Sequence, residues 1–121
     1  MIFSPQIGSY GRLGNQLFQY AAARALSLHR GTDLVVEGLS SNEWHGQQCL
    51  LPHFNINVLE DCESSPRFLY EEADPFKINK NFFEIPDDTL LRGFFQSTFY
   101  FKDFEDVIKN ELQCNPRLST F

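Results

Sequence analysis

The sequence predicts an α/β fold built on a parallel sheet, and three observations carry this prediction. The short apolar segment from Met1 to Ile7 is typical of a strand. A glycine-containing loop then leads into an amphipathic helix, and a second compact apolar run, Leu34-Val35-Val36, follows the helix. Strand, loop, helix and strand in this order form a βαβ unit, whose two strands are parallel. We therefore expect a Rossmann-like domain whose binding site lies at the carboxyl ends of the strands.

Length and composition suit one domain over residues 1–121. Apolar residues make up 42% of the chain and include 13 Phe, which is enough to form a buried core. The number of Phe residues is unusual for a small domain. We therefore hypothesise that some rings cover a surface that a further domain would bury.

The helix after the first loop is predicted to begin near Asn15, which can cap its first turn, and to end at Gly31. At about 100° per residue, one face is apolar and faces the core: it contains Leu17, Phe18, Ala21, Ala22, Ala25 and Leu28. The opposite face is expected in water: it contains Gln16, Gln19, Ala23, Ser27 and Arg30. Arg24 and Arg30 are interpreted as solvated side chains.

The loop before this helix is the strongest candidate for a binding site. Gly11 and Gly14 let the backbone approach a ligand, and the free amides of a helix N-terminus bind phosphate. Arg12 lies inside the loop and can grip phosphate oxygens. The glycines do not spell G-x-G-x-x-G and no lysine follows, so a simple tight turn remains an alternative.

The middle of the chain is less regular. Residues 38–48 are polar and predict a loop on the ligand side, where Trp44 and His45 could contact a sugar; the alternative for Trp44 is a lid over the core edge. Alternating apolar residues in 50–59 predict a short strand or extended segment with one buried face, namely Phe54, Ile56 and Val58. Residues 61–66 predict a turn, and 68–83 an extended excursion with a hairpin that covers one side of the sheet.

A turn at residues 86–89 precedes a predicted buried central strand that contains Leu90, Leu91 and Phe94. Gln96 and Ser97 follow at its carboxyl end and are candidate site residues, although Ser97 can instead cap the next helix. That helix is predicted from Tyr100 to Gln113. Its core face contains Phe101, Phe104, Ile108 and Leu112, and Glu105 and Lys109 pair on its exposed side with Asp103 and Asp106 nearby. Asn115-Pro116 is predicted to end it, before a loose tail at 117–121.

Charge and composition exclude several classes of function. The net charge of −6 without a basic stripe argues against nucleic acid as a partner. The three cysteines, Cys49, Cys62 and Cys114, form no C-x-x-C and indicate a reducing compartment, and the three histidines show no metal-ligand spacing. No leader sequence and no apolar run of membrane-spanning length is visible.

Two blocks of the sequence resemble one family. The first block is Gly11-Arg12-Leu13-Gly14-Asn15-Gln16-Leu17-Phe18-Gln19-Tyr20-Ala21. It resembles the opening signature of the α-1,2-fucosyltransferases of glycosyltransferase family 11. A similar Gly-Arg-x-Gly-Asn-Gln element occurs in the protein O-fucosyltransferases. The second is similar to the family's Gly-aromatic-Phe-Gln-Ser segment: it is Leu91-Arg92-Gly93-Phe94-Phe95-Gln96-Ser97, followed by Tyr100-Phe101. The two blocks occur in the family's order.

The resemblance implies a GT-B glycosyltransferase that moves L-fucose from GDP-fucose to the 2-hydroxyl of a terminal galactoside, with inversion and without a metal. It implies that Arg12 and Asn15 face the diphosphate as catalytic residues. The expected substrate-binding residues are Gly11, Gly14, Gln16, Trp44, His45, Gln96 and Ser97. The family's His-x-Arg-Arg-x-Asp motif is not in this chain, so the resemblance implies an amino-terminal, acceptor-side half whose donor domain belongs to a longer or a separate chain. The expected location is the cytoplasm or the inner face of the membrane, as in soluble bacterial or viral relatives.

Two other functions are open at this stage. The first is a truncated, non-catalytic remnant that binds a glycan or nucleotide through the same fold. The second is a nucleotide-binding oxidoreductase domain, suggested by the βαβ unit and by Glu37 at the end of the second strand, but that class requires the G-x-G-x-x-G pattern.

Overall fold

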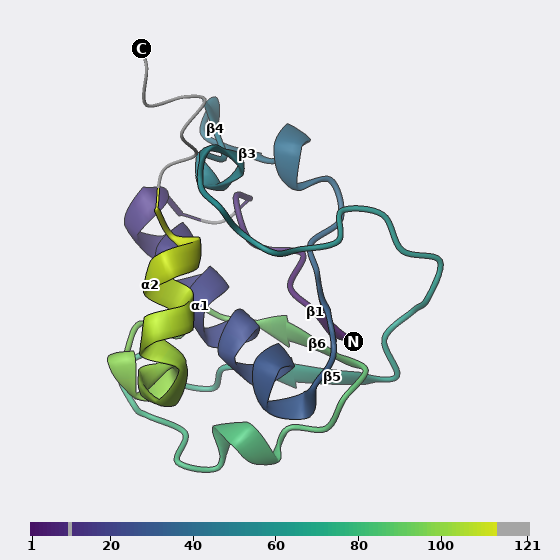
Figure 1. Cartoon of the computed structure of the whole chain (residues 1–121), viewed down its shortest axis with the longest axis vertical. Helices are drawn as coiled ribbons and strands as arrows, with labels where there is room; N and C mark the ends of the chain where they lie inside the picture. Colours follow the sequence, from purple (N-terminus) through teal and green to yellow (C-terminus); the bar gives the residue numbers. More distant parts are fainter. Residues whose placement is uncertain (10, 114–121) are drawn as a thin grey trace.

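A four-stranded parallel sheet forms the centre of the computed structural model, which describes residues 1–9 and 11–113 (Figure 1). The strand order is β2-β1-β6-β5. These strands are β1 (Ile2–Phe3), β2 (Leu34–Val35), β5 (Phe68–Glu71) and β6 (Thr89–Arg92). The α/β class and the parallel sheet are therefore as predicted, and the arrangement is compatible with a Rossmann-like fold.

The two inner strands, β1 and β6, are those that the sequence placed in the core. Ile2 lies between Leu34 of β2 and Thr89 of β6, and all three side chains are buried. Their side chains belong to the sheet face that packs against the long helix, as alternation along a strand requires. The predicted central strand is confirmed at Leu90 and Leu91, of which Leu91 is buried and Leu90 half-buried, but Phe94 lies beyond the end of β6.

Strand β5 corrects the prediction for residues 68–83. The segment is no hairpin, because β5 pairs in parallel with β6, with Phe68 opposite Thr89 and Glu71 opposite Arg92. Parallel pairing needs a long return connection. Residues 72–88 provide it, and they include the 3-10 turn η3 (Phe82–Glu84).

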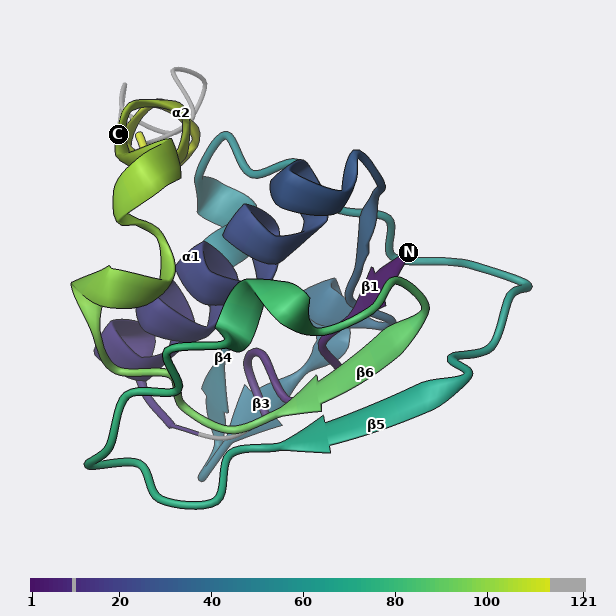
Figure 2. The same cartoon turned by 90° about the horizontal axis from the view of Figure 1, so that it is seen from below.

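Helix α1 (Leu13–Arg30) packs against the sheet, and Figure 2 shows it lying across the strands with helix α2 beside it. The predicted polar face was wrong: Gln16, Gln19, Ala23 and Ser27 are all buried. The reason is that α1 touches the sheet on one side and 3-10 turns, α2 and other segments on the rest of its surface. Of the predicted polar face, only Arg30 is exposed, and it donates hydrogen bonds to the carbonyls of Phe83 and Ile85.

The ends of α1 differ in how well they were predicted. Gly31 ends the helix as expected, with a φ of 67°. At the other end the prediction was wrong, because Arg12 occupies the N-cap position without a capping side-chain hydrogen bond. Asn15 lies in the first turn, and its side chain points to another loop rather than to its own backbone.

Arg24 was also predicted wrongly, because it lies buried between α1 and α2. Its guanidinium forms an ion pair with Glu111 at 3.1 Å, and the hydroxyl of Tyr20 donates to the same carboxylate. Burial, and then the neighbouring Glu111, raise the pKa of Tyr20. The amide of Asn57 donates to the Tyr20 oxygen at 3.1 Å, so this buried polar cluster joins three segments.

The carboxyl-terminal helix is shorter than predicted. Two 3-10 turns, η4 (Thr98–Tyr100) and η5 (Lys102–Phe104), precede α2 (Glu105–Glu111). Phe101 and Phe104 leave helical φ values, at −138° and −120°, and their rings pack near Phe18 and Phe83. The predicted core face is confirmed at Ile108, which is buried, and the predicted exposed pairing of Glu105 with Lys109 is present at 2.9 Å. The predictions for Cys114, for Asn115-Pro116 and for the tail lie outside the described residues.

Between β2 and β5 the chain forms small local structures. Residues 38–48 contain the 3-10 turn η1 (Leu39–Ser41) and the hairpin of β3 (Glu43–Trp44) and β4 (Gln47–Gln48), so this segment is more ordered than the predicted loop. The 3-10 turn η2 (Leu51–His53) follows. Phe54, Ile56 and Val58 then pack partly buried against the core, which confirms the predicted extended segment.

Most of the aromatic rings are used inside the fold. Phe82, Phe95 and Tyr100 form a contiguous cluster, with ring centroids 4.7 to 5.7 Å apart. Two other rings are exposed, Phe68 at 51% and Phe76 at 95%.

Cys49 and Cys62 are free thiols. No helix within residues 1–9 and 11–113 has the length and apolar character to cross a membrane.

Candidate functional site

The candidate site lies where the parallel strands end, and two segments far apart in the sequence meet there. Loops leave the carboxyl ends of all four strands at one edge of the sheet. The side-chain amide of Gln96, after β6, donates a hydrogen bond to the side-chain oxygen of Asn15 in α1, although 81 positions separate them. The two sequence blocks that resemble the fucosyltransferases therefore touch at this edge.

The amino-terminal end of α1 has the character of an anion site. Arg12 is exposed, and its guanidinium takes part in none of the ion pairs found among the described residues. No acidic residue lies in the first turn of the helix, so no carboxylate of that turn offsets the positive end of the helix dipole. A guanidinium beside the first amides of a helix is the combination that binds a phosphate group.

The two glycines of the loop are used differently by the fold. Gly11 has a φ of 92°, and a Cβ there would come within 2.6 Å of the Cβ of Asn15, so the fold itself requires glycine. Gly14 is exposed, has no positive φ, and would place a Cβ in open space. The described residues therefore leave room for a side chain at this position, and the expectation that Gly14 contacts substrate stays a prediction.

Gln16 supports the loop from inside. It is 3% exposed, its amide nitrogen donates to the carbonyl of Gly11 at 3.4 Å, and its oxygen accepts from the amide of Leu50 at 3.3 Å. Its side chain thus fixes the loop against the segment after the β3–β4 hairpin. The expectation that Gln16 touches substrate remains a prediction.

Residues 93–97 are held by two side chains from neighbouring strand ends. The amide of Gly93 donates to Gln6, after β1, at 3.0 Å. One oxygen of Glu72, after β5, accepts from the amides of Phe94 and Phe95 at 3.1 and 3.4 Å. Phe95 is buried with a φ of 50°, a strained conformation for a bulky side chain. Such strain is typical of segments whose exact position matters for function.

Glu72 fits tightly into this arrangement. Its second carboxylate oxygen is buried and has no hydrogen-bond partner among the residues that the structure describes. A Cβ on Gly93 would lie 2.6 Å from the Cβ of Glu72, so these two residues approach as closely as glycine permits. The contacts position Gln96 next to Asn15.

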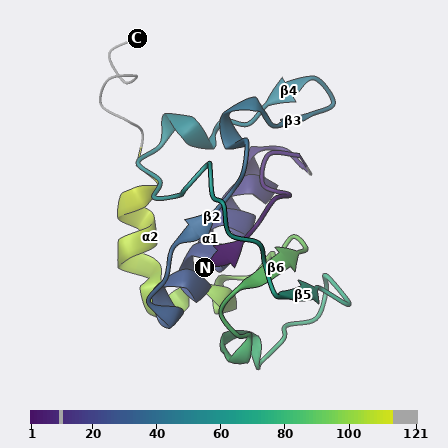
Figure 3. The ribbon, with the colours of Figure 1, turned by 90° about the vertical axis from the view of Figure 1, so that its right-hand side faces the viewer.

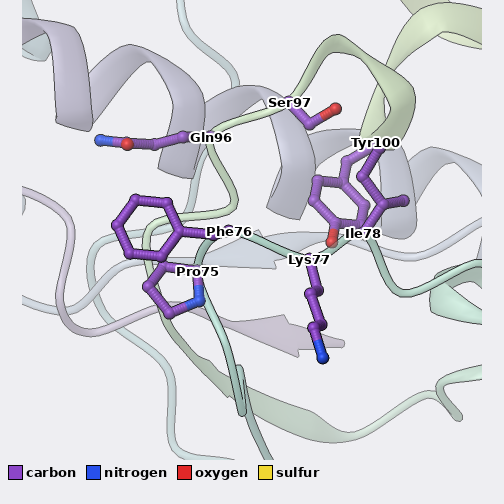
Figure 4. Close-up of a pocket in the computed structure, with 7 residues that line it drawn as sticks. All are labelled: Pro75, Phe76, Lys77, Ile78, Gln96, Ser97 and Tyr100. Atoms are coloured by element: carbon purple, nitrogen blue, oxygen red, sulfur yellow. The ribbon is translucent and has the colours of Figure 1, made fainter.

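Ser97 caps the turn that follows, as the alternative prediction had it, because its hydroxyl accepts from the amide of Phe99 at 3.2 Å. The same side chain lines a hollow beside Gln96 (Figure 4). The two roles are compatible, since a hydroxyl can accept one hydrogen bond and donate another.

Trp44 and His45 come from a different segment of the chain than Asn15 and Gln96. They belong to the β3–β4 hairpin, which stands at one end of the long axis of the molecule, while β5 and β6 lie toward the other end (Figures 1 and 3). Trp44 is partly buried and meets the ring of His45 edge-on, with centroids 4.4 Å apart. The structure therefore brings Asn15, Gln96 and Ser97 into one neighbourhood. The hairpin is joined to the loop before α1 at its base, where the amide of Leu50 donates to Gln16, and a substrate contact of Trp44 or His45 stays a prediction.

Hollows surround the connection between β5 and η3 at the same edge of the sheet. One, of about 310 Å³, lies between residues 75–78 and residues 96–100. A second, of about 440 Å³, lies between Gln6, Glu72 and Gly93. Among the described residues, no group of three or more His, Cys, Asp or Glu side chains could hold a metal ion.

Three residues of this region were missed at the sequence level. Gln6 and Glu72 are polar residues placed directly after parallel strands, a position that in itself indicates the binding edge of the sheet. Phe76 stands in a turn context, Asp74-Pro75-Phe76-Lys77, where a ring is expected to be exposed.

No protein-family model, curated protein or solved structure matches the chain.

Proposed function

We propose that this chain is the amino-terminal, acceptor-side domain of a GT-B α-1,2-fucosyltransferase that uses GDP-fucose as its donor. The observation that carries the proposal is the contact between Asn15 and Gln96. The two blocks resemble the family separately, and a hydrogen bond joins them at the carboxyl edge of a parallel sheet. The proposed partners are GDP-fucose, a galactoside and a donor domain in a longer or separate chain.

Catalysis would depend on charge that develops on the leaving diphosphate. The 2-hydroxyl oxygen of the acceptor would form a bond to C1 of fucose on the face opposite the diphosphate and give up its proton to a general base, while the bond from C1 to the phosphate oxygen breaks and GDP departs. No residue of this chain is assigned as that base. Arg12 and the first amides of α1 would stabilise that negative charge. Asn15, held by Gln96, would orient the same phosphates.

Titration of the isotope-labelled chain with GDP-fucose, followed by amide NMR, tests the donor site. We expect weak binding, with shifts confined to the first turn of α1 and residues 93–97, and loss of those shifts in Arg12→Ala. Arg67→Ala is the matched control, because Arg67 is exposed and precedes β5 at the opposite edge of the sheet. Micromolar affinity, or equal effects of the two variants, would contradict the proposal.

Turnover tests the catalytic assignment. In a protein that also carries the donor domain, Arg12→Ala or Asn15→Ala should lower the transfer of fucose by more than about tenfold, because each removes a donor that acts on the developing charge. Near-normal turnover in either variant would remove that residue from the catalytic site.

A further inference from the structure

Phe76 is the most exposed large apolar side chain in the part of the chain that the structure describes. Its side chain is 95% exposed, although such a ring gains free energy from burial. The surrounding turn is fixed rather than loose: the carboxylate of Asp74 accepts from the amide of Phe76 at 2.9 Å, and the carbonyl of Asp74 accepts from the amide of Lys77 at 3.1 Å. The fold therefore holds this ring outward in a defined place.

The ring borders the hollow of about 310 Å³ described above. Figure 4 shows the Phe76 ring and the Gln96 side chain extending in the same direction from opposite walls, with Ser97 and Tyr100 further along. One side of the hollow thus carries an aromatic ring and the other an amide and a hydroxyl. The volume is at the lower limit of ligand pockets, about 300 Å³, and suits a small ligand.

These groups match the two surfaces of a pyranose ring. One face of a sugar such as galactose presents C–H groups, which pack on an aromatic ring, and its edge presents hydroxyls, which need amide and hydroxyl partners. Gln96 and Ser97 offer both donors and acceptors. The hydroxyl of Tyr100, which also lines the hollow, accepts a hydrogen bond from the amide of Asn79 at 2.9 Å, and this contact fixes the position of the Tyr100 side chain.

The hollow also adjoins the proposed donor site. Gln96 lines it and at the same time donates to Asn15, so a ligand in the hollow would lie next to the first turn of α1. A sugar bound against Phe76 would therefore stand beside the diphosphate site rather than inside it. That is the relation between an acceptor and a donor in a transfer reaction.

We propose that Phe76, Gln96 and Ser97 form the subsite that binds one pyranose unit of the acceptor glycan, with Phe76 as the stacking platform. The subsite deepens the proposed function and rests on it for the identity of the sugar, galactose. Trp44, the aromatic residue that the sequence suggested for a sugar contact, lies on the β3–β4 hairpin and does not line this hollow.

The test uses the chain itself, titrated with methyl β-D-galactopyranoside and followed by amide NMR. We expect shifts at residues 76–78 and 96–100, and about tenfold weaker binding in Phe76→Ala, the loss typical of one aromatic contact. Because the ring is almost fully exposed, this variant keeps the fold. Phe68→Ala is the matched control: it removes the other exposed ring, on β5 and outside the hollow, and should leave the affinity unchanged.

The outcomes separate the subsite from the proposed function. Galactoside shifts elsewhere, no shifts up to the solubility limit of the sugar, or equal affinities of Phe76→Ala and the parent would overturn the subsite, while GDP-fucose binding at Arg12 would be untouched. Galactoside binding that depends on Phe76, without any response to GDP-fucose, would keep a sugar subsite and refute the transferase. Addition of GDP together with the galactoside should shift both sets of residues at once.

Discussion

At the scale of single residues, the charges of Arg24 and Glu111 are matched by each other inside the fold. Arg24 and Glu111 are nearly buried, at 9% and 12% side-chain exposure, and the guanidinium forms three hydrogen bonds of 3.1 to 3.2 Å to the carboxylate. Removal of one partner would leave a buried charge unpaired, which costs far more than the pair itself contributes.

Glu111→Ala should therefore destabilise the protein strongly, by about 3–5 kcal/mol, because Arg24 stays buried without its counter-charge. Urea unfolding followed by circular dichroism measures the change. Glu105→Ala is the control, since its pair with Lys109 is exposed and screened by water, so that its loss should change stability little. Similar losses in the two variants would show that the Arg24 pair is solvated in solution.

Replacement of Gly14 is expected to affect the stability of the fold and the binding of a ligand in opposite directions. A methyl group there meets open space in the free protein, so Gly14→Ala should raise the free energy of unfolding by about 0.5 kcal/mol through better helix propensity. The same methyl group should weaken GDP-fucose binding several-fold, because it would stand between the backbone and the diphosphate.

The two effects of Gly14→Ala are measured by urea unfolding and by the NMR titration with GDP-fucose. Asn110→Ala serves as the control, because Asn110 is an exposed position of α2, where alanine improves helix propensity away from the site. Unchanged donor affinity in Gly14→Ala would mean that this glycine does not contact the nucleotide.

At the scale of elements, the start of β1 is tied to the start of β6. The amino group of Met1 lies 2.6 Å from a carboxylate oxygen of Asp87, which also accepts from the hydroxyl of Thr32 at 3.1 Å. Burial by itself would raise the pKa of Asp87, but the hydrogen bonds from Met1, the backbone of Asp88 and Thr32 outweigh it and lower the pKa. The contacts join three segments at the amino-terminal edge of the sheet.

This lowered pKa makes part of the stability dependent on pH. The contribution of Asp87 is complete above its ordinary pKa of 3.8 and is lost as the pH falls through the lower pKa of the folded state. Asp87→Asn should thus unfold at a lower temperature than the parent near neutral pH, and the difference should disappear in strong acid. Thermal unfolding across the pH range measures this, with exposed Asp103→Asn as the control. A difference that persists in strong acid would exclude the charge of Asp87 as its cause.

At the scale of the whole molecule, the candidate site lies at the carboxyl edge of the sheet, whereas the outer strand β5 exposes apolar side chains to water. The edge strand β5 presents Phe68 and Leu69 at 51% and 56% exposure, and Leu69 continues the row of Val35, Phe3 and Leu90 across the sheet. An exposed apolar edge strand is a template for pairing with a second chain.

Leu69→Lys should reduce the self-association of the chain at high concentration without lowering its unfolding temperature, because a lysine on an edge strand opposes strand pairing. Sedimentation velocity over a range of protein concentrations, together with thermal unfolding, measures both quantities. Leu91→Lys provides the contrast, since Leu91 is buried in β6 and its replacement should unfold the protein. Self-association that is unchanged in Leu69→Lys would place the contact between chains on another surface.

Local sequence signals determined the parts of this structure that depend on neighbouring residues. Gly31 ends α1, apolar residues form β1, β2 and β6, and Ser97 caps the turn that follows the last strand, because turn chemistry and periodicity act within a few residues. The two blocks around Asn15 and Gln96 were likewise visible in the sequence as separate motifs.

Only the tertiary structure decided which distant segments meet. It buried Gln16 and Arg24 on a helix that reads as amphipathic, added β5 to the parallel sheet, joined Asn15 to Gln96, and held Phe76 outward beside them. The physical reason is that each of these features is set by contacts between residues far apart in the chain. Helical periodicity reports one apolar face, whereas α1 is enclosed by the sheet, α2 and several turns, whose positions no local pattern contains.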